Sequence, residues 1–253
     1  MNLSAIILTR NEEKNIEACL KSVSFCDEII VIDDNSTDQT ISLAKKLGAK
    51  IIVHSLENDF AKQRTFGLSK AQCEWVLFLD ADERISKDLQ KEILQAIEKK
   101  SHISGYYLRR LDYMWGKFLK HGETGDLYFL RLAKKTAGKW IGKVHESWIS
   151  NQPTGELKET LVHYPHVTLQ EFLQEINFYS TLRAQELFQQ KQKTSSFQII
   201  AYPTGKFLIN YFVKLGFLDG MPGLVFAICM SFHSFLARSK LWQLWDNHEI
   251  QQK

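Results

Sequence analysis

The stretch "WVLFLDADE", residues 75–83, joins an apolar run to a cluster of acidic side chains. The run is apolar at successive positions without alternation, which is typical of a strand in a parallel sheet that helices cover on both faces. Three carboxylates follow it closely, on Asp80, Asp82 and Glu83. Because like charges at such short separations repel one another, the stretch raises the question of which positive charge it meets.

Three further runs of the same character lie upstream, and they are "LSAIILT" (3–9), "EIIVID" (28–33) and "KIIVH" (50–54). Helical patterns alternate with the runs, at residues 12–24, 38–47, 60–71 and 86–100. This alternation predicts an α/β domain with right-handed crossovers, in which helices flank a mostly parallel central sheet. In such sheets ligands bind beyond the carboxyl ends of the strands.

The first, second and fourth predicted strands each end in polar residues, "TRNEE", "DDNSTD" and "DADE". The carboxyl ends of parallel strands share one edge of a sheet, so we expect the three clusters to converge on one crevice. Within the second cluster, residues 36–39 (Ser-Thr-Asp-Gln) predict a capping box that opens the second helix.

The rest of the chain changes character twice. Residues 104–163 are strand-like and aromatic, which indicates a mixed-sheet extension of the same domain. A long helix should follow, opened by a capping box at residues 168–171 (Thr-Leu-Gln-Glu), and residues 197–245 are apolar and helical with a break around "LDGMPG". We therefore expect a catalytic domain over residues 1–165 and a C-terminal helical region over residues 166–253.

Composition excludes several classes of protein. The 253 residues carry a formal net charge of only +3, which does not suggest a protein that coats nucleic acid. The four cysteines form no CxxC pair, which favours free thiols in a reducing cytosol over disulfides or zinc. No export signal is recognised, so we expect a cytoplasmic protein. No GxGxxG follows the first strand and no GxxxxGK[ST] occurs, which disfavours nicotinamide dehydrogenases and P-loop enzymes.

The acidic strand ends suggest specific chemistry. Asp80 and Asp82 can ligate a hard divalent ion with phosphate oxygens completing its shell, or they can stand in a solvated turn that caps the helix near Ser86. Asp33 or Asp34 can accept hydrogen bonds from a base or ribose, or can serve only in helix capping. Their expected convergence favours a metal and phosphate site.

Together "TRNEE", "VIDDNSTDQT" and "FAKQRTFGLSKAQCEWVLFLDADE" resemble the inverting family 2 glycosyltransferases, which have the GT-A fold. The later pieces "RLAKKTAGKWIGKVHE" and "GFLDGMPGL" resemble the branch that includes lipopolysaccharide core glucosyltransferases. One departure is that Thr65 and Phe66 follow the "QR" pair, where members of the family often carry Asn.

The resemblance implies a role for each matching residue. Asp34 and the segment Thr9, Arg10, Asn11 and Glu12 would hold the uridine end of a nucleotide sugar. Arg64 would face the nucleotide, and Asp80 and Asp82 would hold the diphosphate through Mg²⁺ or Mn²⁺. Glu146 in "KVHE" would be the catalytic base, with His145 beside it in the substrate site.

The chemistry of glycosyl transfer supports this reading of the residues. Charge that develops on the leaving diphosphate must be neutralised, which suits a metal held by Asp80 and Asp82. The acceptor hydroxyl must lose a proton to a positioned group, which suits Glu146 with His145. The alternative for His145 and Glu146 is a strand-end pair without catalytic duty.

Other basic residues have two readings. Five of them in "YYLRR" and "FLRLAKK" can bind phosphates of the acceptor or the leaving diphosphate, or can form a solvated strand face: Arg109, Arg110, Arg131, Lys134 and Lys135. His163 and His166 in "VHYPH" can join a site or serve a structural purpose.

The predicted function is metal-dependent inverting transfer of a hexose, with glucose from a UDP-sugar favoured, to a lipopolysaccharide core or other lipid-linked acceptor. One alternative is a sugar nucleotidyltransferase, although "TRNEEKN" lacks the glycine-rich loop expected there. Another is a non-catalytic membrane-docking scaffold with a sugar-nucleotide fold.

The tail contains two apolar arms, "FLINYFVKLGFL" and "GLVFAICMSFHSFLA", joined through "DGMPG". Basic residues and tryptophans lie in or beside these arms, namely Lys206, Lys214, Arg238, Lys240, Trp242 and Trp245. This pattern suits an interfacial helix pair and predicts a peripheral protein on the cytoplasmic face of the inner membrane. The alternative is a helical hairpin that packs on the catalytic domain or on a second subunit.

Overall fold

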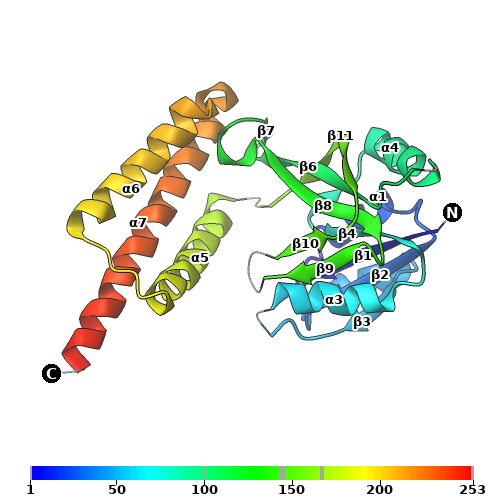
Figure 1. Cartoon of the computed structure of the whole chain (residues 1–253), viewed down its shortest axis with the longest axis horizontal. Helices are drawn as coiled ribbons and strands as arrows, with labels where there is room; N and C mark the ends of the chain where they lie inside the picture. The colour runs from blue at the N-terminus through cyan, green and yellow to red at the C-terminus, as the bar shows by residue number, and fades with distance from the viewer. Residues whose placement is uncertain (1, 58, 100, 143–145, 166–167, 252–253) are drawn as a thin grey trace. The chain divides into compact units, whose positions relative to one another are not determined.

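The computed structural model describes residues 2–57, 59–99, 101–142, 146–165 and 168–251 (Figure 1). The chain divides into two compact units. The sheet unit comprises Met1–Leu111 and Leu127–His163, and the helical unit comprises Asp112–Asp126 and Tyr164–Lys253. The segment Asp112–Asp126 thus belongs to the helical unit, whereas the sequence division assigned it to the first domain.

The parallel part of the main sheet consists of the four strands that the apolar runs predict. They are β1 (Leu3–Thr9), β2 (Glu28–Asp33), β3 (Lys50–Val53) and β4 (Trp75–Asp80), in the order β3-β2-β1-β4. The connecting helices are α1 (Ile16–Ser22), α2 (Thr40–Lys46), α3 (Phe60–Lys70) and α4 (Lys87–Glu98). The expected α/β fold with a helical C-terminal extension is confirmed.

Antiparallel strands extend this sheet beyond β4, as the mixed-sheet reading predicts. The order continues through β8 (Leu127–Lys134), β6 (Gly105–Met114), β11 (Thr154–His163) and β5 (Glu83–Arg84), and β7 (Lys117–Leu119) pairs with β6. A separate hairpin is formed by β9 (Gly138–Ile141) and β10 (Ser147–Ser150). The register of β11 and β5 sets His163 opposite Glu83, which brings the end of β11 to the acidic cluster.

Both faces of the sheet are buried, which explains why its strands are apolar without alternation. On β1, Leu3, Ala5 and Ile7 pack into one hydrophobic cluster, while Ile6 and Leu8 pack into the other. Side chains on both faces of β1 are therefore buried away from water, and its two polar residues, Ser4 and Thr9, lie near the two ends of the strand.

The helical unit contains α5 (Leu169–Gln189), α6 (Ser196–Leu208), a π-helical turn η2 (Ile209–Val213), a 3₁₀ turn η3 (Gly216–Asp219) and α7 (Gly220–Gln251), and also the short 3₁₀ turn η1 (Gly122–Thr124). The predicted capping box at Thr168 and Glu171 is confirmed. The box predicted at residues 36–39 is wrong, because α2 begins at Thr40 and Asp38 accepts hydrogen bonds from the Thr40 backbone and hydroxyl instead.

The break around "LDGMPG" occurs between η2 and α7. Leu215 and Gly220 have positive φ, and a Cβ at Gly223 would lie 2.1 Å from the Gly216 carbonyl oxygen. Within the described residues, one helical segment, Gly216–His248, is long and apolar enough to cross a membrane by length and composition. The share of its apolar window that is buried is only 28%.

Candidate active site

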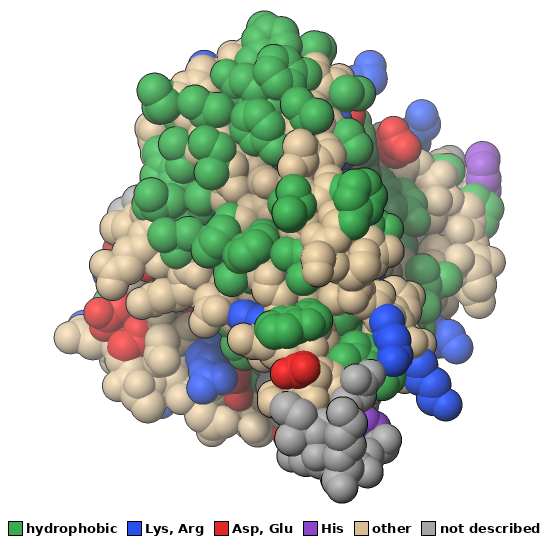
Figure 2. Space-filling view, turned by 90° about the vertical axis from the view of Figure 1, so that its left-hand side faces the viewer, with side chains coloured by type: hydrophobic (Ala, Val, Ile, Leu, Met, Phe, Trp, Pro, Cys, Tyr) green, Lys and Arg blue, Asp and Glu red, His purple; other side chains and the backbone are tan. Residues whose placement is uncertain are grey.

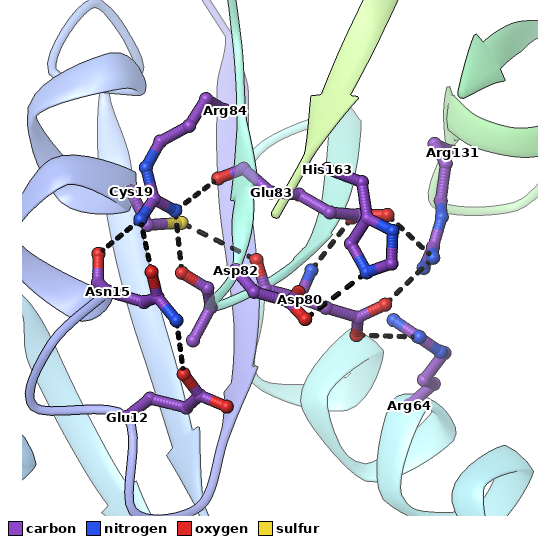
Figure 3. Close-up of polar contacts among 11 residues, drawn as sticks. Glu12, Asn15, Cys19, Arg64, Asp80, Asp82, Glu83, Arg84, Arg131 and His163 are labelled. Carbon is purple, nitrogen blue, oxygen red and sulfur yellow. Dashed lines mark hydrogen bonds and ion pairs between the residues drawn. The ribbon is translucent and has the colours of Figure 1, made fainter. Parts of the chain in front are cut away.

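The repulsion within "DADE" is relieved by two arginines that arrive from distant elements (Figure 3). Asp80 ends β4, and its Oδ1 accepts a hydrogen bond from Nη2 of Arg64 on α3 at 2.8 Å. Its Oδ2 accepts from Nη2 of Arg131 on β8 at 2.9 Å. Burial alone would raise the pKa of Asp80, but the two guanidinium groups outweigh it and hold that pKa well below its ordinary value.

Glu83 supports the same turn from inside. Its side chain is fully buried, its Oε2 accepts the backbone N–H of Asp80 at 2.9 Å, and its Oε1 lies 3.3 Å from Nη2 of Arg131. Burial raises the pKa of Glu83, although Arg131 opposes the shift. Helix α4 is capped by Ser86, whose hydroxyl accepts from the N–H of Leu89, so capping by the acidic cluster is excluded.

Asp82 has a different environment from its neighbours. Its Oδ2 lies 3.2 Å from Nε2 of His163, and its Oδ1 is buried with no hydrogen-bond partner in the part of the chain that the structure describes. A buried carboxylate oxygen beside an imidazole nitrogen fits the donor set of a divalent ion. Among the described residues, no group of three or more His, Cys, Asp or Glu side chains is placed to hold a metal ion.

Arg64 joins this cluster to Glu146. Its side chain is only 2% exposed, and its Nε donates to Oε1 of Glu146 at 2.8 Å. The guanidinium also lies 4.9 Å from the ring centre of Trp140 on β9, which supports it from the side. Arg64 therefore fixes the spacing between Asp80 and the expected base. His145 and His166 lie outside the described residues.

Phe66, which follows Thr65 in the departure from the family pattern, has a structural contact. Phe66 stacks on His54 with ring centres 3.7 Å apart. Gln63 holds the same histidine through its backbone carbonyl, to which Nε2 of Gln63 donates at 2.7 Å. Gln63 and Phe66 thus fasten α3 to the end of β3, and they leave Arg64 to face the acidic cluster.

A hollow of about 230 Å³ lies beyond the carboxyl ends of β1, β2 and β3. Its lining residues are Arg10, Asp34, Asn35, Ser55, Leu56 and Glu57. Asp34 accepts from Nη1 of Arg10 at 3.1 Å and from the backbone N–H of Leu56 at 2.9 Å. Asp33 is fully buried and accepts from the N–H of Ser36, so Asp34 is the carboxylate that borders the hollow.

The rest of the "TRNEE" segment ties β1 to the loop after β2. Thr9 is buried, and Asn11, at φ 54°, donates its N–H to Ser36 Oγ and accepts from Thr37. The N–H of Glu12 donates to Thr40 Oγ1 at 2.8 Å. Of the four predicted residues in this segment, only Arg10 lines the hollow.

Glu12 in this segment has a strongly shifted pKa. Burial raises its pKa from 4.5 to about 7, the hydrogen bond from Asn15 opposes this shift, and the charge of Asp82 adds to it. The end of β1 thus lies within electrostatic reach of the acidic cluster.

Two residues of the site were not assigned to it from the sequence. Arg84 donates to the carbonyls of Ala81 and Asn15, and it holds the turn after β4 against α1. Arg131 was considered only as one of five basic residues for phosphates, but it is 5% exposed and engaged by Asp80 and Glu83. Lys134 pairs with Glu74 at 2.9 Å, consistent with the strand-face alternative.

Comparison with known proteins identifies the class. Residues 4–151 match the family model for glycosyl transferase family 2, which is more than half of the chain. The chain therefore belongs to glycosyltransferase family 2 and is a glycosyltransferase with an α/β, GT-A-like sheet. This membership argues against the nucleotidyltransferase and scaffold alternatives.

Individual relatives extend over nearly the whole chain. An uncharacterized glycosyltransferase of Rickettsia conorii is 31% identical over 94% of this chain and 89% of its own length. The lipopolysaccharide core biosynthesis glycosyltransferase LpsC of Rhizobium meliloti is 27% identical over 95% of this chain and 92% of its own. A solved structure of glucosyl-3-phosphoglycerate synthase from Mycobacterium tuberculosis has a TM-score of 0.49 and 16% identity, covering 77% of this chain and 80% of that one.

We predict that Glu12→Gln stabilises the protein at alkaline pH. The folded state keeps a proton on Glu12 that the unfolded chain releases from pH 4.5 upward, so stability falls between pH 4.5 and about 7 and stays reduced above it. Gln cannot ionise, so the Tm of the variant should exceed that of the parent by an amount that grows from pH 5 to pH 8. At pH 8 the difference should be on the order of a few degrees. The measurement is thermal unfolding across this range.

The matched control is Glu17→Gln. Glu17 is an exposed glutamate of α1 whose pKa is lowered by a hydrogen bond from Lys21, so its replacement should give no alkaline gain. An equal pH dependence for Glu12→Gln and the parent would contradict the assignment of a buried, uncompensated carboxylate.

Proposed function

We propose that the protein is a metal-dependent inverting glycosyltransferase that moves a hexose, with glucose from a UDP-sugar favoured, to a lipopolysaccharide core or other lipid-linked acceptor. The proposal rests mainly on the different partners of three carboxylates, those of Asp80, Asp82 and Glu146. Both carboxylate oxygens of Asp80 are paired, one with Arg64 and the other with Arg131. Asp82 has one oxygen near His163 and one buried oxygen without a partner among the described residues. Glu146 is oriented by a hydrogen bond from Arg64.

The donor's nucleoside would bind in the hollow at the ends of β1, β2 and β3. Asp34 borders it and can accept hydrogen bonds from the base or the ribose. Its present partner Arg10 has a side chain that is 67% exposed, so it can turn toward the ligand at little cost. Thr9, Asn11 and Glu12 would shape this end of the site through the backbone.

Mg²⁺ or Mn²⁺ would be held by Asp82, which directly precedes β5, and by His163 at the end of β11, whose Nε2 lies 3.2 Å from Oδ2 of Asp82. When bound, such an ion neutralises the charge that develops on the leaving diphosphate. Asp80, expected from the sequence to be a direct ligand, would act differently, because both of its oxygens are occupied by guanidinium groups. It would fix the turn that presents Asp82.

Glu146 would remove the proton from the acceptor hydroxyl. Its Oε1 is held by Arg64, and Oε2 has no hydrogen-bond partner among the residues described, so it can receive that proton. The ion pair orients the carboxylate before the acceptor binds, which lowers the entropic cost of reaching the reactive geometry.

One relative and the exposed apolar side chains of the helical unit support the proposed acceptor and location. One relative acts, by its name, in lipopolysaccharide core biosynthesis, and an acceptor of this kind is anchored in lipid. The helical unit exposes large apolar side chains, including Phe197, Val213 and Met221, each at least 70% exposed. A peripheral position on the cytoplasmic leaflet of the inner membrane would cover them and bring the enzyme to its acceptor.

Asp82→Ala should weaken binding of UDP-glucose in saturating Mn²⁺ by about tenfold or more, because one ligand of the ion is lost. In EDTA its affinity should equal that of the parent. The measurement is calorimetric titration with and without Mn²⁺, and Asp88→Ala on α4 is the control, since that aspartate is 70% exposed and pairs with Lys91 at 3.1 Å instead of with the site. Unchanged donor affinity in saturating Mn²⁺ would exclude Asp82 as a ligand.

Glu146→Gln should retain donor affinity and lose transfer rate by roughly a hundredfold, since Gln can still accept from Arg64 but cannot take a proton. Transfer from labelled UDP-glucose to lipopolysaccharide core acceptor measures the rate, and titration measures the affinity. If turnover with this acceptor were unchanged, the base would have to be another residue, and Asp126 would be tested next.

A further inference from the structure

The helical unit contains a groove of about 550 Å³ that the proposed reaction does not use. It is bordered by α5, α6, the η2 turn and α7, and its lining residues are Arg183, Ala201, Tyr202, Gly205, Lys206, Ile209, His233, Ser234, Ala237 and Arg238. Three of these residues are cations, contributed by three different helices, and no carboxylate lines the groove among the residues described.

The cations are not fully neutralised by the protein. Lys206 pairs with Glu123, and Arg183 pairs with Glu186 at 2.5 Å, but both acids lie outside the lining of the groove. Arg238 has no carboxylate partner within the described part of the chain, and its guanidinium lies 3.6 Å from the ring centre of Tyr202. Its Nη1 donates to Oγ of Ser234 at 3.4 Å, and the stacking holds Arg238 in place while its other N–H donors can meet an anion.

The pKa of His233 is affected by the same positive charges. Burial lowers its pKa, and the nearby charges of Lys206, Lys240 and Arg183 lower it further, against the opposing charge of Glu123. The groove therefore has a positive potential that an anion would relieve.

Small side chains line the groove on two helices. They are Ala201 and Gly205 on α6 and Ser234 and Ala237 on α7. A Cβ added at Gly205 would meet no atom within 4 Å, so this position opens onto empty space. A larger side chain at residue 205 would fill the groove without disturbing the backbone.

The border of the groove is apolar and exposed. Tyr202 and Ile209 line it and are 51% and 49% exposed, and further apolar side chains follow along the same two elements (Figure 2). They are Phe197, Ile200, Leu208, Phe212 and Val213. An apolar partner helix in this groove would bury Arg238 without a counter-charge, which is costly. A ligand with an anionic head and apolar chains matches both features.

We propose that this groove binds the phosphate head group of an anionic membrane lipid, with Lys206, Arg183 and Arg238 around the phosphate and the acyl chains along the exposed apolar residues of α6 and η2. This inference rests on the membrane location proposed above and adds a defined lipid site to it. Binding there would anchor the helical unit by one specific head group as well as by general attraction to a charged leaflet.

The test uses the full-length protein and flotation with phosphatidylcholine vesicles that contain phosphatidic acid. Gly205→Leu fills the groove and changes no charge, so general electrostatic attraction predicts no effect, whereas a head-group site predicts a loss of vesicle partition of about tenfold or more. Arg238→Gln should lose at least as much. The control Lys214→Gln removes an exposed charge of the same unit outside the groove, and should lose about fivefold at most.

Thermal unfolding and UDP-glucose titration establish that each variant is folded. If the parent binds anionic vesicles and Gly205→Leu binds them equally, the membrane location stands and the lipid site is wrong. If the parent ignores vesicles, both are wrong, while the proposed transfer reaction is judged separately by the Asp82 and Glu146 variants. Inorganic phosphate that stabilises the parent but not Gly205→Leu, without a vesicle effect, would identify a free-phosphate site and overturn the lipid assignment.

Discussion

A buried guanidinium between two carboxylates organises the catalytic half of this glycosyltransferase. Arg64 is almost fully buried and reaches Asp80 and Glu146 at 2.8 Å each. A buried charge is tolerated only when it is paired, so the ends of β4, α3 and the segment before β10 must keep their spacing for Arg64 to remain satisfied. The same pairing holds Asp80, the last residue of β4, and the expected base Glu146 in one rigid arrangement, which catalysis by positioning requires.

The three crowded carboxylates of "DADE" are thereby given different environments. Asp80 forms ion pairs with two arginines, and Glu83 forms an ion pair with one of them, Arg131. These pairs offset the repulsion between the two carboxylates inside the protein. Asp82 meets only a histidine among the described residues and keeps one buried oxygen unpartnered. The three acids look alike in the sequence, but Asp80 and Glu83 are paired within the protein, whereas Asp82 has an oxygen that can bind a ligand.

The strands of the parallel sheet could be predicted almost to the residue, because burial on both faces produces apolar runs such as 3–9, 28–33 and 75–80. The convergence of their polar ends followed from topology. The partners of those ends could not be predicted: Arg131 lies 51 residues after Asp80, His163 lies 81 residues after Asp82, and antiparallel pairing at such separations leaves no local signal. Local capping failed at residues 36–39 because Asp38 bonds to Thr40, which the pattern did not reveal.

We propose that Asp82 with His163, and not Asp80, is the part of the acidic cluster available to a metal. The decisive measurement is a crystal structure of the protein with UDP and Mn²⁺, with the ion located by anomalous scattering. We expect manganese bonded to Asp82 and His163, with Asp80 still paired to Arg64 and Arg131. Manganese bonded to Asp80, with either arginine displaced from its carboxylate, would contradict it.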